Sequence, residues 1–173
     1  QMDGNPVIFS AGYHGNIMCH TQSGELLFST DTGEGFPFDI DAGNLDADNN
    51  SEVLVASSDG NIYALDDDGS VLWVFEKEAP MYQVHITNQN GIPYVFCGGV
   101  DRLLYQLDSQ GNLLNSFDTE RVIRLINSGN IKGDGEKYLA VASARMALSG
   151  KLQLHLFHIP SLNKVWTTDL GYD

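Results

Sequence analysis

Oxygen-bearing side chains are concentrated in one short stretch, which is the first candidate for chemistry. Residues 44–52 read NLDADNNSE and carry Asn or Asp at every second position, followed by Glu52. Alternating oxygen donors in a tight loop, closed by a carboxylate, suit Ca²⁺, which prefers oxygen ligands at ~2.3–2.6 Å. The same residues could instead form an Asx-rich turn held by bonds from its side chains to its own backbone. Calcium binding is the favoured interpretation, and the turn stays open as the alternative.

Two related loops lack this donor pattern. Residues 130–135 place Lys132 where a ligand is needed, and an ammonium group would occupy the position of the cation. Residues 88–91 (NQNG) contain no carboxylate. We therefore expect no metal at either loop, and at most one structural Ca²⁺ in the chain.

Histidines and loop residues are weaker candidates. For the five histidines we expect ordinary surface or core positions, although one of them, His85, lies on a predicted inner strand and can face a channel; they are His14, His20, His85, His155 and His158. Aromatic and charged residues in the predicted loops of one face suit a sugar or a protein surface, although loops are polar in any protein. This predicted ligand-binding face consists of Tyr13, His14, Phe36, Asp59, Tyr82, Asp101, Arg102, Arg121 and Arg145.

The elements that must position these residues belong to a repeat. The clearest copy, residues 52–76, contains three short apolar strands separated by turns at Ser58-Asp59-Gly60 and Asp67-Asp68-Gly69. Its turn glycine Gly69 is matched by Gly24 and Gly111, roughly forty residues away on either side. A further extended segment precedes each copy except the first, at residues 37–44, 81–88 and 122–130.

A four-stranded unit of this length predicts an all-β fold, a β-propeller with about four blades of four-stranded antiparallel sheet. We expect a single domain over 1–173, with a partial first blade at 5–31 and further blades at 36–77, 80–118 and 121–169. Because a single sheet cannot bury both faces, blades must pack on one another, and a large residue closing three copies (Phe28, Trp73, Trp166) is expected at each junction. Asn115 breaks this pattern in the third copy.

The repeat is similar to known propeller families. NIYALDDDGSVLW (residues 61–73) resembles the PQQ-like, quinoprotein-type repeat, and GNLDADNNSEVLVAS (residues 43–57) resembles FG-GAP or VCBS repeats. The latter resemblance implies a Ca²⁺ loop with side-chain ligands Asn44, Asp46, Asp48 and Glu52 and the backbone carbonyl of Asn50. Asn44 replaces the usual Asp and Asn49 the usual Gly. Rings of these families imply that the chain is part of a larger propeller of about six to eight blades.

Composition limits the partners. The formal net charge is −14 at pH 7, so nucleic acid and anionic membrane surfaces are poor partners. No apolar run reaches the ~20 residues that cross a bilayer, so we expect no membrane insertion. Cys19 and Cys97 fall in blades that are not neighbours, and we expect them to be free, buried thiols.

The leading functional hypothesis is a non-catalytic binding module of an exported bacterial-type protein, located in the periplasm or secreted, that recognises a protein or glycan. The alternative is part of a propeller enzyme, either a polysaccharide lyase or a quinoprotein dehydrogenase. No adjacent cysteine pair is present, and no PQQ cofactor is expected. A purely structural scaffold is a third hypothesis.

Overall fold

The computed structural model describes residues 1–173 except 3, 34, 47, 146–151 and 172–173. The described residues form fifteen β-strands in four antiparallel sheets. The first sheet contains β1 (Val7–Ala11), β2 (Asn16–Thr21) and β3 (Leu26–Asp31), and the second contains β4 (Pro37–Gly43), β5 (Glu52–Ser57), β6 (Asn61–Leu65) and β7 (Val71–Glu76). The third contains β8 (Met81–Gln89), β9 (Ile92–Gly99), β10 (Leu103–Leu107) and β11 (Leu113–Asp118), and the fourth contains β12 (Val122–Gly129), β13 (Tyr138–Ala144), β14 (Leu152–His158) and β15 (Asn163–Leu170).

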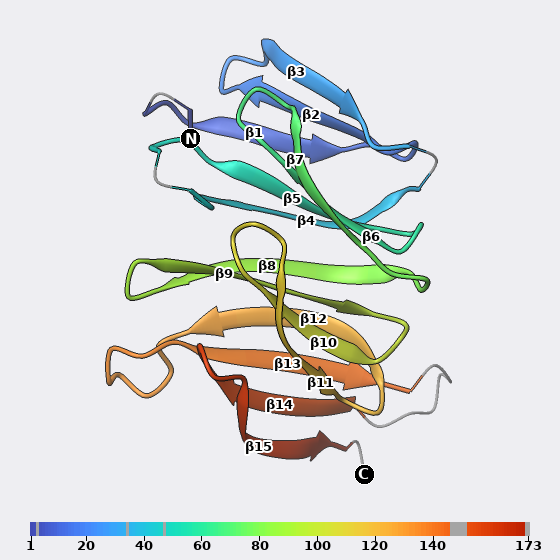
Figure 1. Cartoon of the computed structure of the whole chain (residues 1–173), viewed down its shortest axis with the longest axis vertical. Helices are drawn as coiled ribbons and strands as arrows, with labels where there is room; N and C mark the ends of the chain where they lie inside the picture. Colours follow the sequence, from blue (N-terminus) through green and yellow to red (C-terminus); the bar gives the residue numbers. More distant parts are fainter. Residues whose placement is uncertain (3, 34, 47, 146–151, 172–173) are drawn as a thin grey trace.

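Each sheet is a meander in which neighbours in sequence are neighbours in space. The sheets follow one another along the long axis of the molecule, in chain order from β1–β3 to β12–β15 (Figure 1). We call β4, β8 and β12 the inner strands, because β8 contacts both of the others across the junctions between sheets. The all-β propeller fold is therefore confirmed, with a first blade of three strands and three blades of four. The division into domains stays a prediction.

Three apolar cores lie between successive sheets. Alternate side chains of a strand point to opposite faces, and β5 uses both faces. Val53 and Val55 pack with Ile17 towards the first sheet, while Leu54 and Ala56 pack towards the third. All six residues of β5 are buried, and each fully buried aliphatic side chain contributes roughly 1.5–3 kcal/mol. The third core joins the last two sheets around Phe96, Phe157 and their neighbours. The sheets are thus held together by packing between blades.

The junctions repeat one contact between an aromatic ring and a turn glycine. Gly69 and Gly111 adopt φ values of +86° and +80°, and a Cβ on either would lie 2.6 Å from a ring atom of Phe28 or Trp73, respectively. The Trp73 indole N–H also donates to the Ser109 carbonyl at 2.9 Å. Trp166 occupies the equivalent place in the last sheet and is 41 % exposed.

At the third junction, polar groups take the place of the aromatic ring that Asn115 replaces. The Asn115 amide donates to Gln106 Oε1 at 3.0 Å, and the Gln106 amide donates to the Pro160 carbonyl at 2.7 Å. Gln106 is fully buried, so these bonds satisfy an amide that packing alone would leave without partners.

Two sets of loops share one face of the molecule, which we call the loop face. The turn after the second strand of a blade bonds to the link that leads to the next inner strand. Thr32 N–H donates to the Gly15 carbonyl at 3.0 Å, Lys77 N–H to Gly60 at 3.1 Å and Thr119 N–H to Arg102 at 3.0 Å. These connections lie on the right of Figure 1, and the described residues between β4 and β5, 44–46 and 48–51, lie at the opposite end of the strands.

Cys19 and Cys97 are both free and buried, as the sequence predicts. Burial raises the pKa of the Cys19 thiol, and to a larger extent that of Cys97. Among the described residues, no helix has the length and apolar character needed to cross a membrane.

Candidate functional site

Each inner strand begins with a β-bulge on the loop face. The pairing register shifts between Pro37 and Asp39, between Met81 and Gln83, and between Ile123 and Leu125. The extra residues are Phe38, Tyr82 and Arg124, which occupy equivalent places in three successive blades. Bulges turn a side chain away from the regular strand direction and are frequent next to functional sites.

The bulge residues form the centre of a continuous row. The rings of Phe38 and Tyr82 lie 4.6 Å apart between centroids, and the Arg124 guanidinium carbon lies 5.1 Å from the Tyr82 centroid. On the other side, Phe36 contacts Phe38 at 4.7 Å and stacks parallel to Tyr13 at 5.5 Å. His14 contacts Tyr13 edge-on and completes what we call the aromatic row: His14, Tyr13, Phe36, Phe38, Tyr82 and Arg124.

The aromatic row is accessible. Tyr13 is 76 % exposed and Phe38 is 42 % exposed, while Phe36 and Tyr82 are half-buried. Residues from all four blades contribute, so the packing of the sheets fixes the positions of the rings. Large planar surfaces with polar edges bind ligands that are themselves apolar on one side and polar at the rim. Arg124 adds a cation at one end of the row.

The structure brings four of the sequence-predicted face residues into this row: Tyr13, His14, Phe36 and Tyr82. Phe38 and Arg124 were missed by the sequence analysis. Both fall within segments correctly predicted as inner strands, where regular alternation gives no indication of a bulge. Their equivalence to Tyr82 was available from the repeat, since each is the residue one period away.

Two other predicted face residues are occupied within their own turns. Asp59 accepts the Tyr63 hydroxyl at 2.6 Å, and Asp101 accepts that of Tyr105 at 2.6 Å. Each carboxylate also accepts a backbone N–H from the strand that follows it. Burial is the largest cause of a raised pKa for the phenol of Tyr63 and also for that of Tyr105, and the bond to the carboxylate adds to the shift. These aspartates close the hairpin turns.

The three remaining arginines of the predicted face are spread along it. Arg102 and Arg145 are exposed in turns of the third and fourth blades. Arg121 lies 3.5 Å from the Asp169 carboxylate and is mostly buried.

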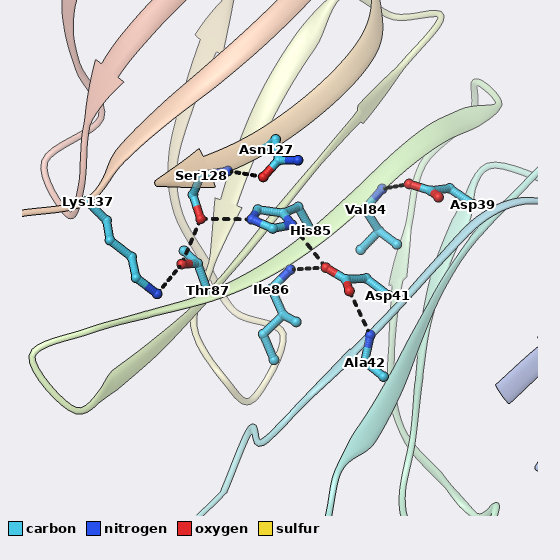
Figure 2. Close-up of polar contacts among 10 residues, drawn as sticks. All are labelled: Asp39, Asp41, Ala42, Val84, His85, Ile86, Thr87, Asn127, Ser128 and Lys137. Carbon is cyan, nitrogen blue, oxygen red and sulfur yellow. Dashed lines mark hydrogen bonds and ion pairs between the residues drawn. The ribbon is translucent and has the colours of Figure 1, made fainter. Parts of the chain in front are cut away.

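A second polar site lies along the inner strands. Asp39 and Asp41 of β4 accept the edge N–H groups of Val84 and Ile86 in β8, at 3.1 and 3.0 Å. Figure 2 shows His85 between Asp41 and Ser128 of β12. We call Asp41, His85, Ser128, Thr87 and Lys137 the channel cluster. All of these residues except Asp41 line part of a pocket of about 460 Å³, which also includes Asn44, Asp46 and Asn88.

Burial changes the two aspartates differently. Burial raises the pKa of Asp39, and the backbone N–H of Val84 only partly offsets it. Burial also acts to raise the pKa of Asp41, but the hydrogen bonds from His85 and from the N–H groups of Ile86 and Ala42 outweigh it, so that this pKa is lowered. Asp41 is therefore held as a carboxylate beside the His85 ring.

The acidic loop, residues 44–52 without the undescribed residue 47, combines both sequence interpretations. Asp46 and Asp48 accept the N–H groups of Asp48 and Asn50 at 2.8 and 2.7 Å, and the Asn44 amide donates to the Asp48 carbonyl. These are the Asx-turn bonds of the alternative. Carboxylate oxygens of Asp46, Asp48 and Glu52 nevertheless lie within 4.8 Å of one another, which is close enough to share a cation.

Glu52 distinguishes this loop from an ordinary turn. Its side chain is fully buried, and Oε2 accepts the Leu45 N–H at 2.5 Å, whereas Oε1 has no hydrogen-bond partner. Burial is the main cause of its raised pKa, and the charges of Asp46 and Asp48 add to the shift. A buried carboxylate oxygen without a partner is costly, and a cation would satisfy it.

The remaining histidines occupy ordinary positions. His155 is buried between Ser143 and Thr167, and burial lowers its pKa, with Lys164 and Arg121 adding to the effect. His158 contacts the Tyr138 ring, and His20 is half-buried in β2.

Known structures share the fold. A chain of a mitotic checkpoint complex superposes with a TM-score of 0.77 at 12 % identity, covering 95 % of this chain and 49 % of that one. BBS1N, from a complex with ARL6DN, gives 0.71 at 17 % identity, covering 94 % and 50 %. The Dos1 propeller gives 0.74 at 12 % identity, covering 94 % and 44 %. This chain thus matches about half of each of these chains.

Sequence relatives are more specific. The lambda-carrageenases of Pseudoalteromonas sp and Pseudoalteromonas carrageenovora are each 28 % identical over 137 residues, which cover 79 % of this chain and 14 % of the relative. The chain therefore spans only a small part of these proteins. Residues 7–125, which include all six members of the aromatic row, match the lambda-carrageenase β-propeller domain. The propeller prediction is confirmed, while the PQQ-like or FG-GAP repeat type stays a prediction. The chain belongs to the family of lambda-carrageenase β-propeller domains.

Proposed function

We propose that this chain is a glycan-binding β-propeller domain of an exported protein, and that the aromatic row is its binding surface. The observation that carries the proposal is the row itself, in which equivalent bulges of three blades present Phe38, Tyr82 and Arg124 side by side. The family relationship supports a polysaccharide as the ligand, since the relatives are named for carrageenan.

Stacking explains why such a row suits a sugar chain. A pyranose ring has an apolar face of C–H groups and a rim of hydroxyls, and aromatic rings offer a matching flat surface with little entropy to lose. Tyr13 and Tyr82 also carry hydroxyls that can bond to the sugar rim. The row contains no carboxylate, so its own role is binding rather than bond cleavage.

The calcium site belongs to the same proposal as a structural element. Asp46, Asp48 and Glu52 would hold the ion with their carboxylates, and Asn44 and Asn50 would add oxygens from the side chain and the backbone. The orphaned Glu52 Oε1 and the hard oxygen donor set support this assignment. When bound, Ca²⁺ would neutralise the carboxylates that join β4 to β5, at the end of the blade opposite to the aromatic row.

Export fits this function. A polysaccharide polymer is met outside the cytoplasm, and a net charge of −14 disfavours nucleic acid as a partner. A protein partner remains the second ligand class, because the same exposed rings would suit a protein surface.

Binding measurements with single-residue variants test the proposal. Tyr13→Ala and Tyr82→Ala should each weaken binding of lambda-carrageenan oligosaccharides about tenfold in isothermal titration calorimetry, because each removes a stacking surface. Trp166→Ala removes an aromatic ring that is 41 % exposed on the outer strand β15, outside the row, and should leave the affinity unchanged. The assignment of the row would be contradicted if all three variants bound as tightly as the unmodified chain. It would also be contradicted if all three lost the same amount of affinity.

A further inference from the structure

The channel cluster contains a serine, a histidine and an aspartate in one hydrogen-bonded line. His85 Nδ1 lies 3.0 Å from Asp41 Oδ2, and His85 Nε2 lies 2.9 Å from Ser128 Oγ. The three residues come from the inner strands of three different blades, β4, β8 and β12 (Figure 2). Such a line is recognised by its geometry and not by the order of its residues in the chain.

The contacts of Asp41 fix how His85 is oriented. One oxygen of the carboxylate accepts both the Ile86 N–H and the imidazole, so the backbone of β8 holds it in place beside the ring. A carboxylate at Nδ1 favours the tautomer with its proton on that nitrogen. Nε2 is then the unprotonated nitrogen and lies 2.9 Å from Ser128 Oγ, so it can take the hydroxyl proton once that proton turns from Thr87 Oγ1 towards the ring.

Ser128 also has polar neighbours on its other side. Its hydroxyl donates to Thr87 Oγ1 at 2.8 Å, and Thr87 Oγ1 also accepts a hydrogen bond from Lys137 Nζ at 3.2 Å. The serine is half-buried and lines the pocket of about 460 Å³ together with His85, Thr87 and Lys137. Lys137 therefore places a cation near the point where negative charge would develop on a carbonyl oxygen.

A second serine–histidine pair in the fourth blade provides an internal comparison. Ser143 Oγ lies 2.8 Å from His155 Nε2, and His155 Nδ1 lies 2.9 Å from Thr167 Oγ1. This pair has a hydroxyl in the place of the carboxylate, and both Ser143 and His155 are buried. The cluster with Ser128 differs in having a carboxylate at Nδ1 of its histidine and a serine that lines a pocket.

We propose that Ser128, His85 and Asp41 form a hydrolytic triad that cleaves carboxylic esters of a small polar alcohol, such as an acylated sugar. The pocket has the volume for one such unit, and its lining is polar. This activity is independent of glycan binding by the aromatic row, which lies at the other end of the inner strands.

The reaction proceeds in two balanced steps. Ser128 Oγ attacks the ester carbonyl carbon while its proton moves to His85 Nε2. The bond from the carbonyl carbon to the alcohol oxygen breaks, and the alcohol leaves with that proton. A water molecule then adds to the acyl-serine, gives a proton to His85 and releases the carboxylic acid, while Ser128 recovers its proton. Asp41 positions the imidazole and stabilises its charged form.

Covalent labelling of the unmodified chain tests the nucleophile without any variant. A fluorophosphonate probe followed by peptide mass spectrometry should place the label on Ser128, and prior incubation with p-nitrophenyl acetate should reduce it. No label, or label spread evenly over exposed serines, would overturn the proposal. If Ser128 is not labelled but the chain still binds carrageenan oligosaccharides, the binding function of the aromatic row stands without the hydrolytic activity.

Substitutions then assign the roles. Ser128→Ala and His85→Ala should lower hydrolysis of p-nitrophenyl acetate roughly a thousandfold, while Ser143→Ala should leave the rate unchanged. Circular dichroism of each variant confirms that it is folded. Equal rates for Ser128→Ala and the unmodified chain would refute a nucleophilic serine.

Asp41→Asn separates two roles of Asp41, which are positioning the His85 ring and bonding to the backbone of the next blade. Its amide oxygen can still accept the Ile86 N–H, but its NH₂ group forces the His85 proton onto Nε2. Nitrogen chemical shifts of His85 should report this change of tautomer, with a loss of labelling at Ser128. If His85 changed tautomer in Asp41→Asn but the probe still labelled Ser128 fully, a positioning role for Asp41 would be excluded.

Discussion

Single buried groups carry much of the chemistry of this propeller, and Glu52 is the clearest case. Its carboxyl is fully buried, and one oxygen has no partner. Because burial raises its pKa in the folded chain, the folded state binds the proton more tightly than the unfolded state does. In the absence of metal, its contribution to stability is therefore present below the usual pKa of 4.5 and is lost as the pH rises through the raised value.

Glu52→Gln should have opposite effects with and without calcium. In EDTA at pH 7.5 the variant should melt at a higher temperature than the unmodified chain, since the buried charge is gone, and the two should converge near pH 4. In Ca²⁺ at a hundredfold excess over Kd, the unmodified chain should gain about 2.7 kcal/mol and the variant much less. Differential scanning fluorimetry measures both.

The double variant Asp46→Ala, Asp48→Ala should likewise erase the stabilisation by Ca²⁺. Glu78→Ala removes an exposed carboxylate on the link between β7 and β8, outside the proposed ligand set, and provides the control. Identical melting curves for the unmodified chain in Ca²⁺ and in EDTA would contradict the metal site.

At the scale of strands and turns, the repeat determines where blades meet. The turn glycine of one blade supports an aromatic ring from the preceding blade, at Gly69 with Phe28 and at Gly111 with Trp73. Gly24 has the same backbone conformation, with φ of +86°, but a Cβ there would meet no heavy atom within 4 Å. Substitution of Gly24 therefore tests backbone strain alone, whereas substitution of Gly69 or Gly111 tests backbone strain together with ring packing.

Gly111→Ala should destabilise the chain more than Gly24→Ala. Both changes place a side chain in the left-handed region, at a cost of about 1 kcal/mol each. Gly111→Ala additionally drives a methyl group into the Trp73 ring, and we expect a total loss of about 2–3 kcal/mol. Urea unfolding followed by circular dichroism gives both values. An equal loss for the two variants would show that ring packing contributes nothing at this junction.

The sequence was sufficient for the strands but not for the aromatic row. The strands and the inner segments were predicted from apolar runs such as 53–55 and from the turn glycines. These signals depend only on residues that are close together in the sequence. The bulges at Phe38 and Arg124 depend on pairing with the neighbouring strand, which no local pattern reveals. The contacts between His85 and the residues of adjacent blades depend on how three sheets pack, so the sequence of one strand predicts only that His85 can face inwards.

At the scale of the whole molecule, stability comes from cores shared between blades, and function lies on surfaces that several blades build together. Such a molecule carries a net charge of −14, so repulsion among its carboxylates opposes the compact state. The screening length falls from ~30 Å at 0.01 M to ~3 Å at 1 M ionic strength, which weakens this repulsion.

Raising NaCl from 0.01 to 0.5 M should therefore increase the melting temperature. The gain should be smaller when Ca²⁺ already neutralises the acidic loop. A melting temperature that falls with salt would indicate that favourable ion pairs, rather than repulsion, dominate the electrostatics of the fold.

The central claim is that glycans bind along the aromatic row on the loop face. Aromatic ¹H–¹³C spectra recorded during titration with lambda-carrageenan oligosaccharides test it most directly, because each ring reports its own environment. We expect the resonances of Tyr13, Phe36, Phe38 and Tyr82 to shift together along one saturating curve, while those of Trp73 and Trp166 stay constant. Shifts confined to rings outside the row, or no saturable shift with any oligosaccharide, would contradict the account.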